Sequence, residues 1–287
     1  MSLLRDRMSR DMQRAGLADR TRSQYIAAIS QMARFFGRSP ELLEPDDIRA
    51  WDDELRRSGI APGWFGVHIA AIRFLYRRTL ARPEMVTFLS TSRPRRRLPI
   101  VLSLDEVFKV LAALRDPRIR TFFTLLADTG LRLSEGADLR VCDIDRACGV
   151  IRVRHGKGDV DRQVKLGDRL YEMLRTHWRE VRLTDPHPEA LSPESLVFAS
   201  RAGTRVCIST LRRALKHATQ AAGITKRVTP HTMRHSFATS QLDSGTELRV
   251  VQAQLGHADI GSTQIYTHVS TRLIREAPCP LDSMPPP

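Results

Sequence analysis

The chain has 287 residues, of which 41% are hydrophobic and 27% are charged, a balance typical of a folded globular protein and not of a disordered or fibrous one. Its longest apolar stretch, residues 122–127 with one Thr inside, is far shorter than the roughly 20 residues that a membrane-spanning helix needs. Lys and Arg total 46 against 32 Asp and Glu, and the resulting net charge of +14 favours a polyanionic partner, either nucleic acid or an anionic membrane surface.

Four helices are predicted within the first 85 residues. Apolar residues recur there at helical spacing, and Gly and Pro separate the periodic segments. The helices are expected at residues 2–15 and 21–36, from Pro45 onward, and from Pro62 to about residue 80. The sequence therefore predicts a helical domain over residues 1–85.

The composition changes between residues 86 and 99. This stretch contains no Asp or Glu, and it holds two prolines and four arginines, Arg93, Arg95, Arg96 and Arg97. Such a run is typical of an extended linker whose arginines lie along the phosphates of a nucleic acid. A solvated surface loop is the alternative interpretation.

Residues 100–277 are predicted to form a second domain, and residues 278–287, half of them Pro, an irregular tail. Strand-like runs at residues 150–154 and 163–166 flank a Gly-Lys-Gly-Asp sequence, which is typical of a β-hairpin. Helical patterns fill most of the rest. We therefore expect a mainly α-helical chain with a small antiparallel β-sheet in the second domain.

Two helices of the second domain have clear end signals. Ser103 and Glu106 form the pattern of a capping box. The apolar stripe of the helix behind it is expected to consist of Leu104, Val107, Phe108, Leu111 and Leu114. The next helix is expected over residues 118–129, because Gly130 follows its last apolar residues.

Five short segments of this domain carry side chains that can bind or transfer charge. They contain Arg132 after a helix end, Lys157 at the hairpin tip, His231 and Arg234 in the first turns of a helix capped by Thr229, His257 at a helix end, and Tyr266. Each has an ordinary structural interpretation when taken alone. A single Arg or Lys is usually a surface charge, His257 can cap its helix, and Tyr266 can pack with its hydroxyl in water.

Neither a metal site nor a disulfide framework is predicted. His231 and His235 stand four positions apart, as in a zinc helix, but Thr232 occupies the place of the Glu that metalloprotease chemistry requires. The 4 cysteines lie at spacings that match neither disulfide nor zinc patterns, and no apolar signal segment follows Met1. We therefore expect a reducing, cytoplasmic location, in association with the nucleoid.

Together, the five segments can perform transesterification at phosphorus. A tyrosine can attack a phosphodiester when the negative charge is neutralised and the leaving oxygen receives a proton. Two Arg side chains suit the non-bridging oxygens and the charge that grows in a pentavalent transition state. Lys and His can move the two protons, and clustered cations favour the phenolate, whose ordinary pKa is about 10. No metal and no cofactor are needed.

The same segments resemble the tyrosine recombinase (phage integrase) family along nearly the whole chain. The similarity rests on residues 129–135, 156–158, 231–239, 255–257 and 265–269. It implies a helical, SAM-like core-binding domain at residues 1–85, a basic linker at 86–99 and an α+β catalytic domain at 100–277. The motifs fit both the Xer-like and the integron-type branches of the family.

This resemblance implies which residues bind phosphate groups of the DNA. Arg132 and Arg234 would bind the scissile phosphate, and His257 would donate a hydrogen bond to it. Glu135 matches an acidic position of the family with a supporting role. The linker arginines would contact the DNA backbone.

The resemblance also implies the residues that move protons and make the covalent bond. Tyr266 would attack the phosphate and form a 3′-phosphotyrosyl link. His231 would be the acid/base partner of this nucleophile, and Lys157 would give a proton to the departing 5′ oxygen.

The implied activity is site-specific cutting and rejoining of duplex DNA, with strand exchange between two sites. Expected partners are double-stranded DNA, further copies of the chain in a tetramer on paired sites, and a second recombinase or an accessory protein; no membrane partner is expected. Two alternatives stay open, a type IB topoisomerase-like nicking and resealing enzyme and a catalytically inactive DNA-binding accessory protein. The second would have no need of Tyr266 and both arginines.

Two departures from the family pattern stand out. Gly136, Ala137 and Asp138 replace apolar residues that usually follow the first catalytic Arg, so the local packing is expected to differ. The prolines at 278, 280 and 285–287 oppose the long C-terminal helix that Xer-type relatives dock on a neighbouring subunit.

Overall fold

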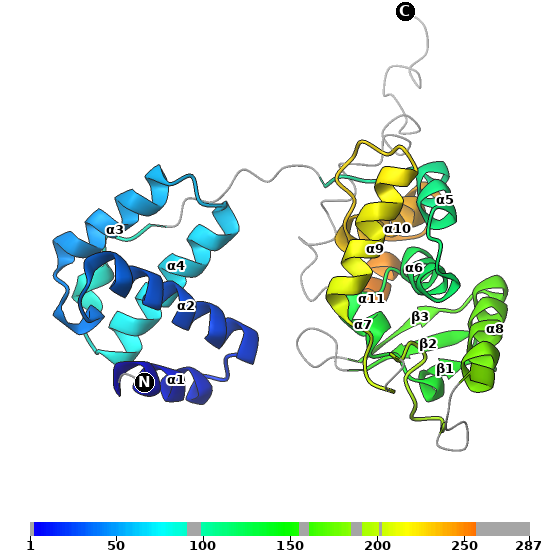
Figure 1. Cartoon of the computed structure of the whole chain (residues 1–287), viewed down its shortest axis with the longest axis horizontal. Coiled ribbons are helices and arrows are strands. Elements are labelled where there is room, and N and C mark those ends of the chain that lie inside the picture. Colours follow the sequence, from blue (N-terminus) through cyan, green and yellow to red (C-terminus); the bar gives the residue numbers. More distant parts are fainter. Residues whose placement is uncertain (1–2, 91–98, 155–160, 185–190, 201–202, 257–287) are drawn as a thin grey trace, which may run out of the picture. The chain divides into compact units, whose positions relative to one another are not determined.

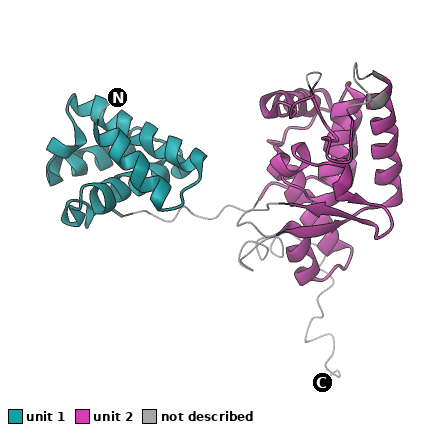
Figure 2. Cartoon of the chain, turned by 90° about the horizontal axis from the view of Figure 1, so that it is seen from below, with its two compact units in different colours: residues 1–96 teal, residues 97–287 magenta. Residues whose placement is uncertain are grey.

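The computed structural model describes residues 3–90, 99–154, 161–184, 191–200 and 203–256. The chain forms two compact units, residues 1–96 and 97–287 (Figure 2). Within the described ranges, no helix has both the length and the apolar character needed to cross a membrane.

The first unit is a helical bundle, as the sequence predicted. Its α-helices are α1 (Leu3–Arg14), α2 (Asp19–Phe36), α3 (Pro45–Arg57) and α4 (Pro62–Phe74), joined and extended by the short turns η1 (Pro40–Leu42), η2 (Leu75–Thr79) and η3 (Pro83–Val86). The hydroxyl of Tyr76 donates to the carbonyl oxygen of Pro40 at 2.7 Å, which fixes η2 against η1. Val86 and Leu89 are buried in the same core, so this unit continues past residue 85.

The second unit combines seven described helices with a small sheet (Figure 1). The helices are α5 (Leu104–Ala112), α6 (Pro117–Thr129), α7 (Leu133–Ala137), α8 (Asp168–Thr184), α9 (Ile208–Ala221), α10 (Pro230–Asp243) and α11 (Leu248–Leu255), with a short turn η4 (Val141–Asp143). These helices and the small sheet confirm the predicted fold class, a mainly α-helical chain with a small antiparallel β-sheet.

The sheet has three antiparallel strands in the order β1 (Ile144–Asp145), β2 (Val150–Val153) and β3 (Arg162–Lys165). Ile151 pairs with Ile144 on one side and with Val164 on the other. The predicted hairpin is therefore confirmed. Figure 1 shows the sheet beside α8, with α6 between α8 and α10.

The capping box at the start of α5 is present. The backbone N–H of Glu106 donates to the Ser103 hydroxyl at 3.2 Å, and the Ser103 N–H donates to the Glu106 carboxylate at 2.8 Å. The expected apolar stripe is only partly correct, because Leu104 and Phe108 are 63% and 66% exposed, whereas Val110 on the same helix is fully buried. Leu111 and Leu114 of the expected stripe are buried, so the helix meets the core with the C-terminal part of that stripe and with Val110.

Two glycines let helices approach closely around α6. Gly130 ends α6 with a left-handed φ of 65°, and a Cβ at this position would collide with the ring of Phe237 on α10. A Cβ at Gly136 would lie 2.9 Å from Cδ2 of Leu126. Gly136 therefore has a packing role, since α7 lies directly against α6.

Candidate active site

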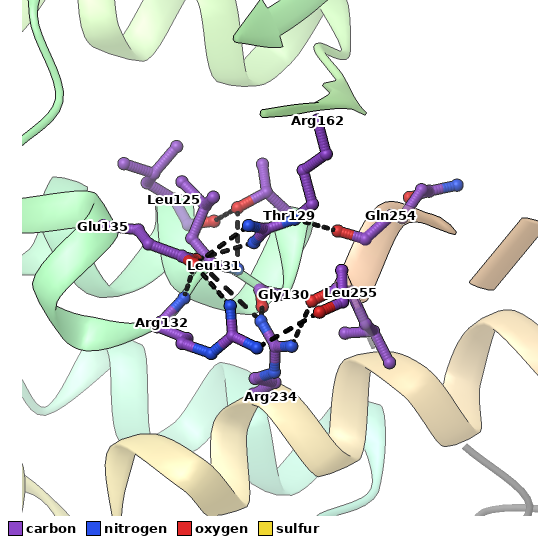
Figure 3. A network of polar contacts seen from close by, with 11 residues as sticks. Leu125, Thr129, Gly130, Leu131, Arg132, Glu135, Arg162, Arg234, Gln254 and Leu255 are labelled. Atoms are coloured by element: carbon purple, nitrogen blue, oxygen red, sulfur yellow. Dashed lines mark hydrogen bonds and ion pairs between the residues drawn. The ribbon is translucent and has the colours of Figure 1, made fainter. Parts of the chain in front are cut away.

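Five elements meet at one polar cluster: the end of α6, the start of α7, strand β3 and the two helices α10 and α11 (Figure 3). The left-handed Gly130 turns the chain out of α6, and Arg132 follows as the residue that caps α7. The hydroxyl of Thr129 donates back to the carbonyl oxygen of Leu125 at 2.6 Å and holds the last turn of α6. The chain reversal thus delivers Arg132 to the cluster.

The carboxylate of Glu135 is the centre of this cluster. Arg132 donates to it twice, from the backbone N–H at 2.7 Å and from the guanidinium group at 2.6 Å. Arg162 makes a bidentate pair with it, at 2.9 and 2.6 Å. The guanidinium group of Arg234 lies 4.0 Å from the same carboxylate. Three cations therefore surround one acid, which leaves the cluster positively charged.

The pKa of Glu135 follows from these contacts. Burial alone would raise the pKa, but the hydrogen bonds and charge of Arg162 and the hydrogen bonds of Arg132 outweigh burial and lower the pKa to about 2. The carboxylate is ionised at every physiological pH, so it holds the guanidinium groups in fixed positions.

The three arginines also bind the end of α11. The carbonyl oxygens of Gln254, Leu255 and Gly256, three successive residues, accept hydrogen bonds from Arg162, Arg234 and Arg132 in that order. The first of these bonds is 2.7 Å long and the last 3.4 Å. The last carbonyls of a helix carry partial negative charge and lack partners within the helix, so cations are favourable there.

His231 lies beside the arginines on the first turn of α10. Thr229 caps this helix, because its hydroxyl accepts from the Thr232 N–H at 3.1 Å. Partial desolvation of the ring, and then the charges of Arg234, Arg212 and Arg132, lower the pKa of His231 below 6.5. The imidazole is therefore neutral at pH 7 and able to accept a proton.

The structure brings three of the six predicted catalytic residues together, Arg132, His231 and Arg234. Of these, Arg132 is 20% exposed in its side chain and Arg234 only 5%. The other three, Lys157, His257 and Tyr266, lie outside the described residues, as do the linker arginines Arg93, Arg95, Arg96 and Arg97.

Sequence reasoning missed Arg162. Its side chain is only 7% exposed, although it stands on a four-residue strand. A signal was present, because Arg162 is two residues before the buried Val164 and so lies on the same face of the strand. A cation on the inward face of a strand requires a buried acidic partner.

The chain matches two protein-family models. Residues 101–272 match the phage integrase family, and residues 4–84 match the N-terminal SAM-like domain of phage integrases.

Curated relatives and solved structures agree with this match. The tyrosine recombinase XerD of Oceanobacillus iheyensis is 33% identical over 280 residues, covering 91% of this chain and 91% of the relative. The crystal structure of the XerA recombinase is 30% identical, covers 95% of both chains and superimposes with a TM-score of 0.55. A lambda integrase tetramer bound to a Holliday junction shares the fold, with 19% identity, coverage of 92% of this chain and 76% of that chain, and a TM-score of 0.73.

Proposed function

Because the chain belongs to the phage integrase family of tyrosine recombinases, we propose that it is a site-specific DNA recombinase that works through a phosphotyrosyl intermediate. It would cut and rejoin duplex DNA and exchange strands between two sites. The observation that carries this proposal is the convergence of Arg132 and Arg234 on the last carbonyls of α11, with His231 near enough for their charges to lower its pKa.

The two arginines supply the binding of the scissile phosphate. Arg132 is held by Glu135 and is partly exposed, so its guanidinium group can meet a non-bridging oxygen. Arg234 is more deeply buried and adds a second positive charge to the site. Because the carboxylate and the α11 carbonyls fix both groups before DNA binds, little reorganisation is needed when charge grows in the transition state.

In the covalent step, one residue makes the new bond to phosphorus and two others transfer the protons. The hydroxyl oxygen of Tyr266 attacks phosphorus, and the bond from phosphorus to the 5′ oxygen breaks. The phenol proton passes to the neutral imidazole of His231, and Lys157 gives a proton to the departing 5′ oxygen. His257 donates a hydrogen bond to the phosphate. The reverse reaction reseals the strand without an external energy source, since the phosphotyrosyl bond conserves the energy of the phosphodiester.

Assembly and location follow from the same proposal. Strand exchange joins two duplex sites, each cut on both strands, and a tetramer supplies one nucleophile per strand. The lambda integrase that forms a tetramer on a Holliday junction shares the fold of this chain. A reaction on chromosomal or mobile DNA implies that the protein acts in the cytoplasm, at the nucleoid, with DNA and a second recombinase or accessory protein as its proposed partners.

A two-site assay tests the proposal. Purified protein is incubated with two labelled duplexes carrying candidate sites from the DNA that flanks its own gene. Recombinant duplexes that join one label to the other are the expected product. Relaxation of supercoiled DNA without any joined product would instead support the topoisomerase-like alternative, and binding without cleavage would support the accessory-protein alternative.

A further inference from the structure

Arg162 connects the acid at the centre of the site to the end of α11. All three of its guanidinium nitrogens are in use: Nε donates to the carbonyl oxygen of Gln254 at 2.7 Å, and the two terminal nitrogens donate to the two carboxylate oxygens of Glu135 at 2.9 and 2.6 Å. We propose that Arg162 is a positioning residue of the strand-transfer reaction, which fixes the end of α11 relative to Glu135 and Arg132. This inference rests on the proposed function.

The contacts of Arg162 distinguish it from the predicted phosphate ligands; burial alone does not, because the side chain of Arg234 is only 5% exposed as well. Its side chain is 7% exposed, and that of Glu135 is equally covered. Its three hydrogen bonds use one N–H of each guanidinium nitrogen, and all three go to protein groups. Arg162 therefore acts through the groups it holds, whereas Arg132 keeps an exposed edge for the phosphate.

The chain leaves α11 in direct contact with Arg162. Gly256 ends the helix with a left-handed φ of 63°, and a Cβ at this position would lie 2.7 Å from Cδ of Arg162. The next residue in the sequence is His257, and Tyr266 follows nine positions later. The segment that carries both residues begins directly after Gly256. Because Arg162 holds the end of α11 at Gln254 and Gly256, it also fixes the position from which this segment starts.

Loss of Arg162 also changes the charge balance of the site. Glu135 would keep Arg132 as its closest cation, with Arg234 at 4.0 Å. A buried carboxylate that has lost its bidentate partner draws more strongly on the remaining cations. Arg132 would then be held toward Glu135 and away from the phosphate. Both effects act on the cleavage step, whereas the duplex is bound mainly by other cations.

The main variant is Arg162→Met, compared with Arg152→Met on the neighbouring strand β2. Arg152 is also ion-paired, to Asp145 at 2.6 Å, but its side chain is 55% exposed. Cleavage of a nicked duplex site at saturating protein should fall about 10²-fold in Arg162→Met, which is the scale expected when a reacting group is displaced by about 1 Å. Affinity for the same duplex should change less than about threefold, and Arg152→Met should match wild type in both.

Arg162→Lys keeps the charge but cannot make three bonds in a plane. It should fold, bind DNA normally and still cleave about 10-fold more slowly than wild type. This variant carries the test if Arg162→Met does not fold. Wild-type cleavage by either variant, or an equal loss of cleavage and affinity, would overturn the inference.

Amide hydrogen exchange on DNA-free protein gives a readout that does not depend on activity. In Arg162→Lys, protection should fall at residues 252–256 and be retained in α8, because the hydrogen bonds of Arg162 go to Gln254 and Glu135, which lie on α11 and α7. Unchanged protection at the end of α11, or an equal loss in α8, would show that Arg162 does not anchor this helix. A wild-type chain that never cleaves DNA would contradict the proposed function, and the exchange result would still decide whether Arg162 anchors α11.

Discussion

Arg234 donates a hydrogen bond to the carbonyl oxygen of Gly130 at 2.7 Å, and this bond ties α10 to the end of α6. The same guanidinium group also donates to the carbonyl oxygen of Leu255 at the end of α11. Arg234 is therefore both a predicted phosphate ligand and a junction between three helices, whereas Arg132 is at the rim of the site. The two arginines should differ when they are removed.

Replacement of either arginine by Ala should reduce cleavage about 10²-fold or more, because each meets charge that grows in the transition state. Affinity for duplex DNA should fall much less, since many other cations bind the backbone. Arg234→Ala should also lower the free energy of unfolding by about 2 kcal/mol, because it leaves buried carbonyl oxygens without a donor. Arg132→Ala should have the smaller effect on stability. Single-turnover kinetics measure the cleavage rate, and urea unfolding measures the free energy of unfolding. If cleavage and DNA affinity fall by the same factor, these arginines only bind the DNA backbone and have no special role in the transition state.

Glu135→Gln should change how stability depends on pH. The folded-state pKa of Glu135 is lowered from 4.5 to about 2, so its contribution is present above pH 4.5 and is lost as the pH falls toward 2. At pH 7 this contribution is about 3 kcal/mol, at about 1.4 kcal/mol per pKa unit. Urea unfolding should show that the variant has a lower free energy of unfolding than wild type at pH 7, and that this difference is smaller at pH 3.

The control for this prediction is Glu172→Gln on α8. Glu172 pairs with Arg175 at 3.2 Å, but its side chain is 59% exposed, so its loss should cost less than about 1 kcal/mol. A gap between wild type and Glu135→Gln that stays constant from pH 7 to pH 3 would contradict the assigned role of the carboxylate.

The titration of His231 should respond to a cation outside the predicted catalytic set. Arg212 on α9 is one of the charges that lower the pKa of His231. Arg212→Gln should therefore raise this pKa toward 6.5, as measured by NMR on DNA-free protein. Arg213 is the next residue and is also exposed, and Arg213→Gln should leave the pKa of His231 unchanged. An unchanged pKa in Arg212→Gln would contradict a contribution from Arg212, and equal shifts in the two variants would show that its charge has no specific effect on His231.

The linker arginines should control the salt dependence of DNA binding. Each cation that contacts phosphate contributes about 0.9 to the slope of log affinity against log salt concentration. Replacement of Arg93, Arg95, Arg96 and Arg97 by Gln should therefore flatten the slope by about two to four units. Sequence preference should change little, because phosphate contacts position a protein without reading bases. An unchanged slope would show that this run is a solvated loop.

Local signals in the sequence predicted the local structure well. The capping box at Ser103, the end of α6 at Gly130 and the β-hairpin each depend on residues a few positions apart, and each is present. The inward face of α5 was only partly predicted, because Leu104 and Phe108 fit a helical period as well as Val110 does. Which face is buried depends on the helices that pack against α5.

The candidate site was predicted as a set of residue types but not as a network. Arg162 and Glu135 are 27 positions apart in sequence and lie on different elements. Likewise, the order in which three arginines bind the last carbonyls of α11 follows from the packing of α7, β3 and α10 around that helix. Sequence periodicity contains no information on such pairings, since they form only when the elements assemble.

The most direct test of the account is to identify the covalent link. Wild-type protein is incubated with a nicked duplex site in excess EDTA, and the trapped protein–DNA adduct is digested and mapped by mass spectrometry. The account predicts a 3′-phosphotyrosyl bond at Tyr266, formed without metal, absent in Tyr266→Phe and greatly reduced in Arg132→Ala. An adduct that persists in Tyr266→Phe, or that forms only when Mg²⁺ is added, would contradict it.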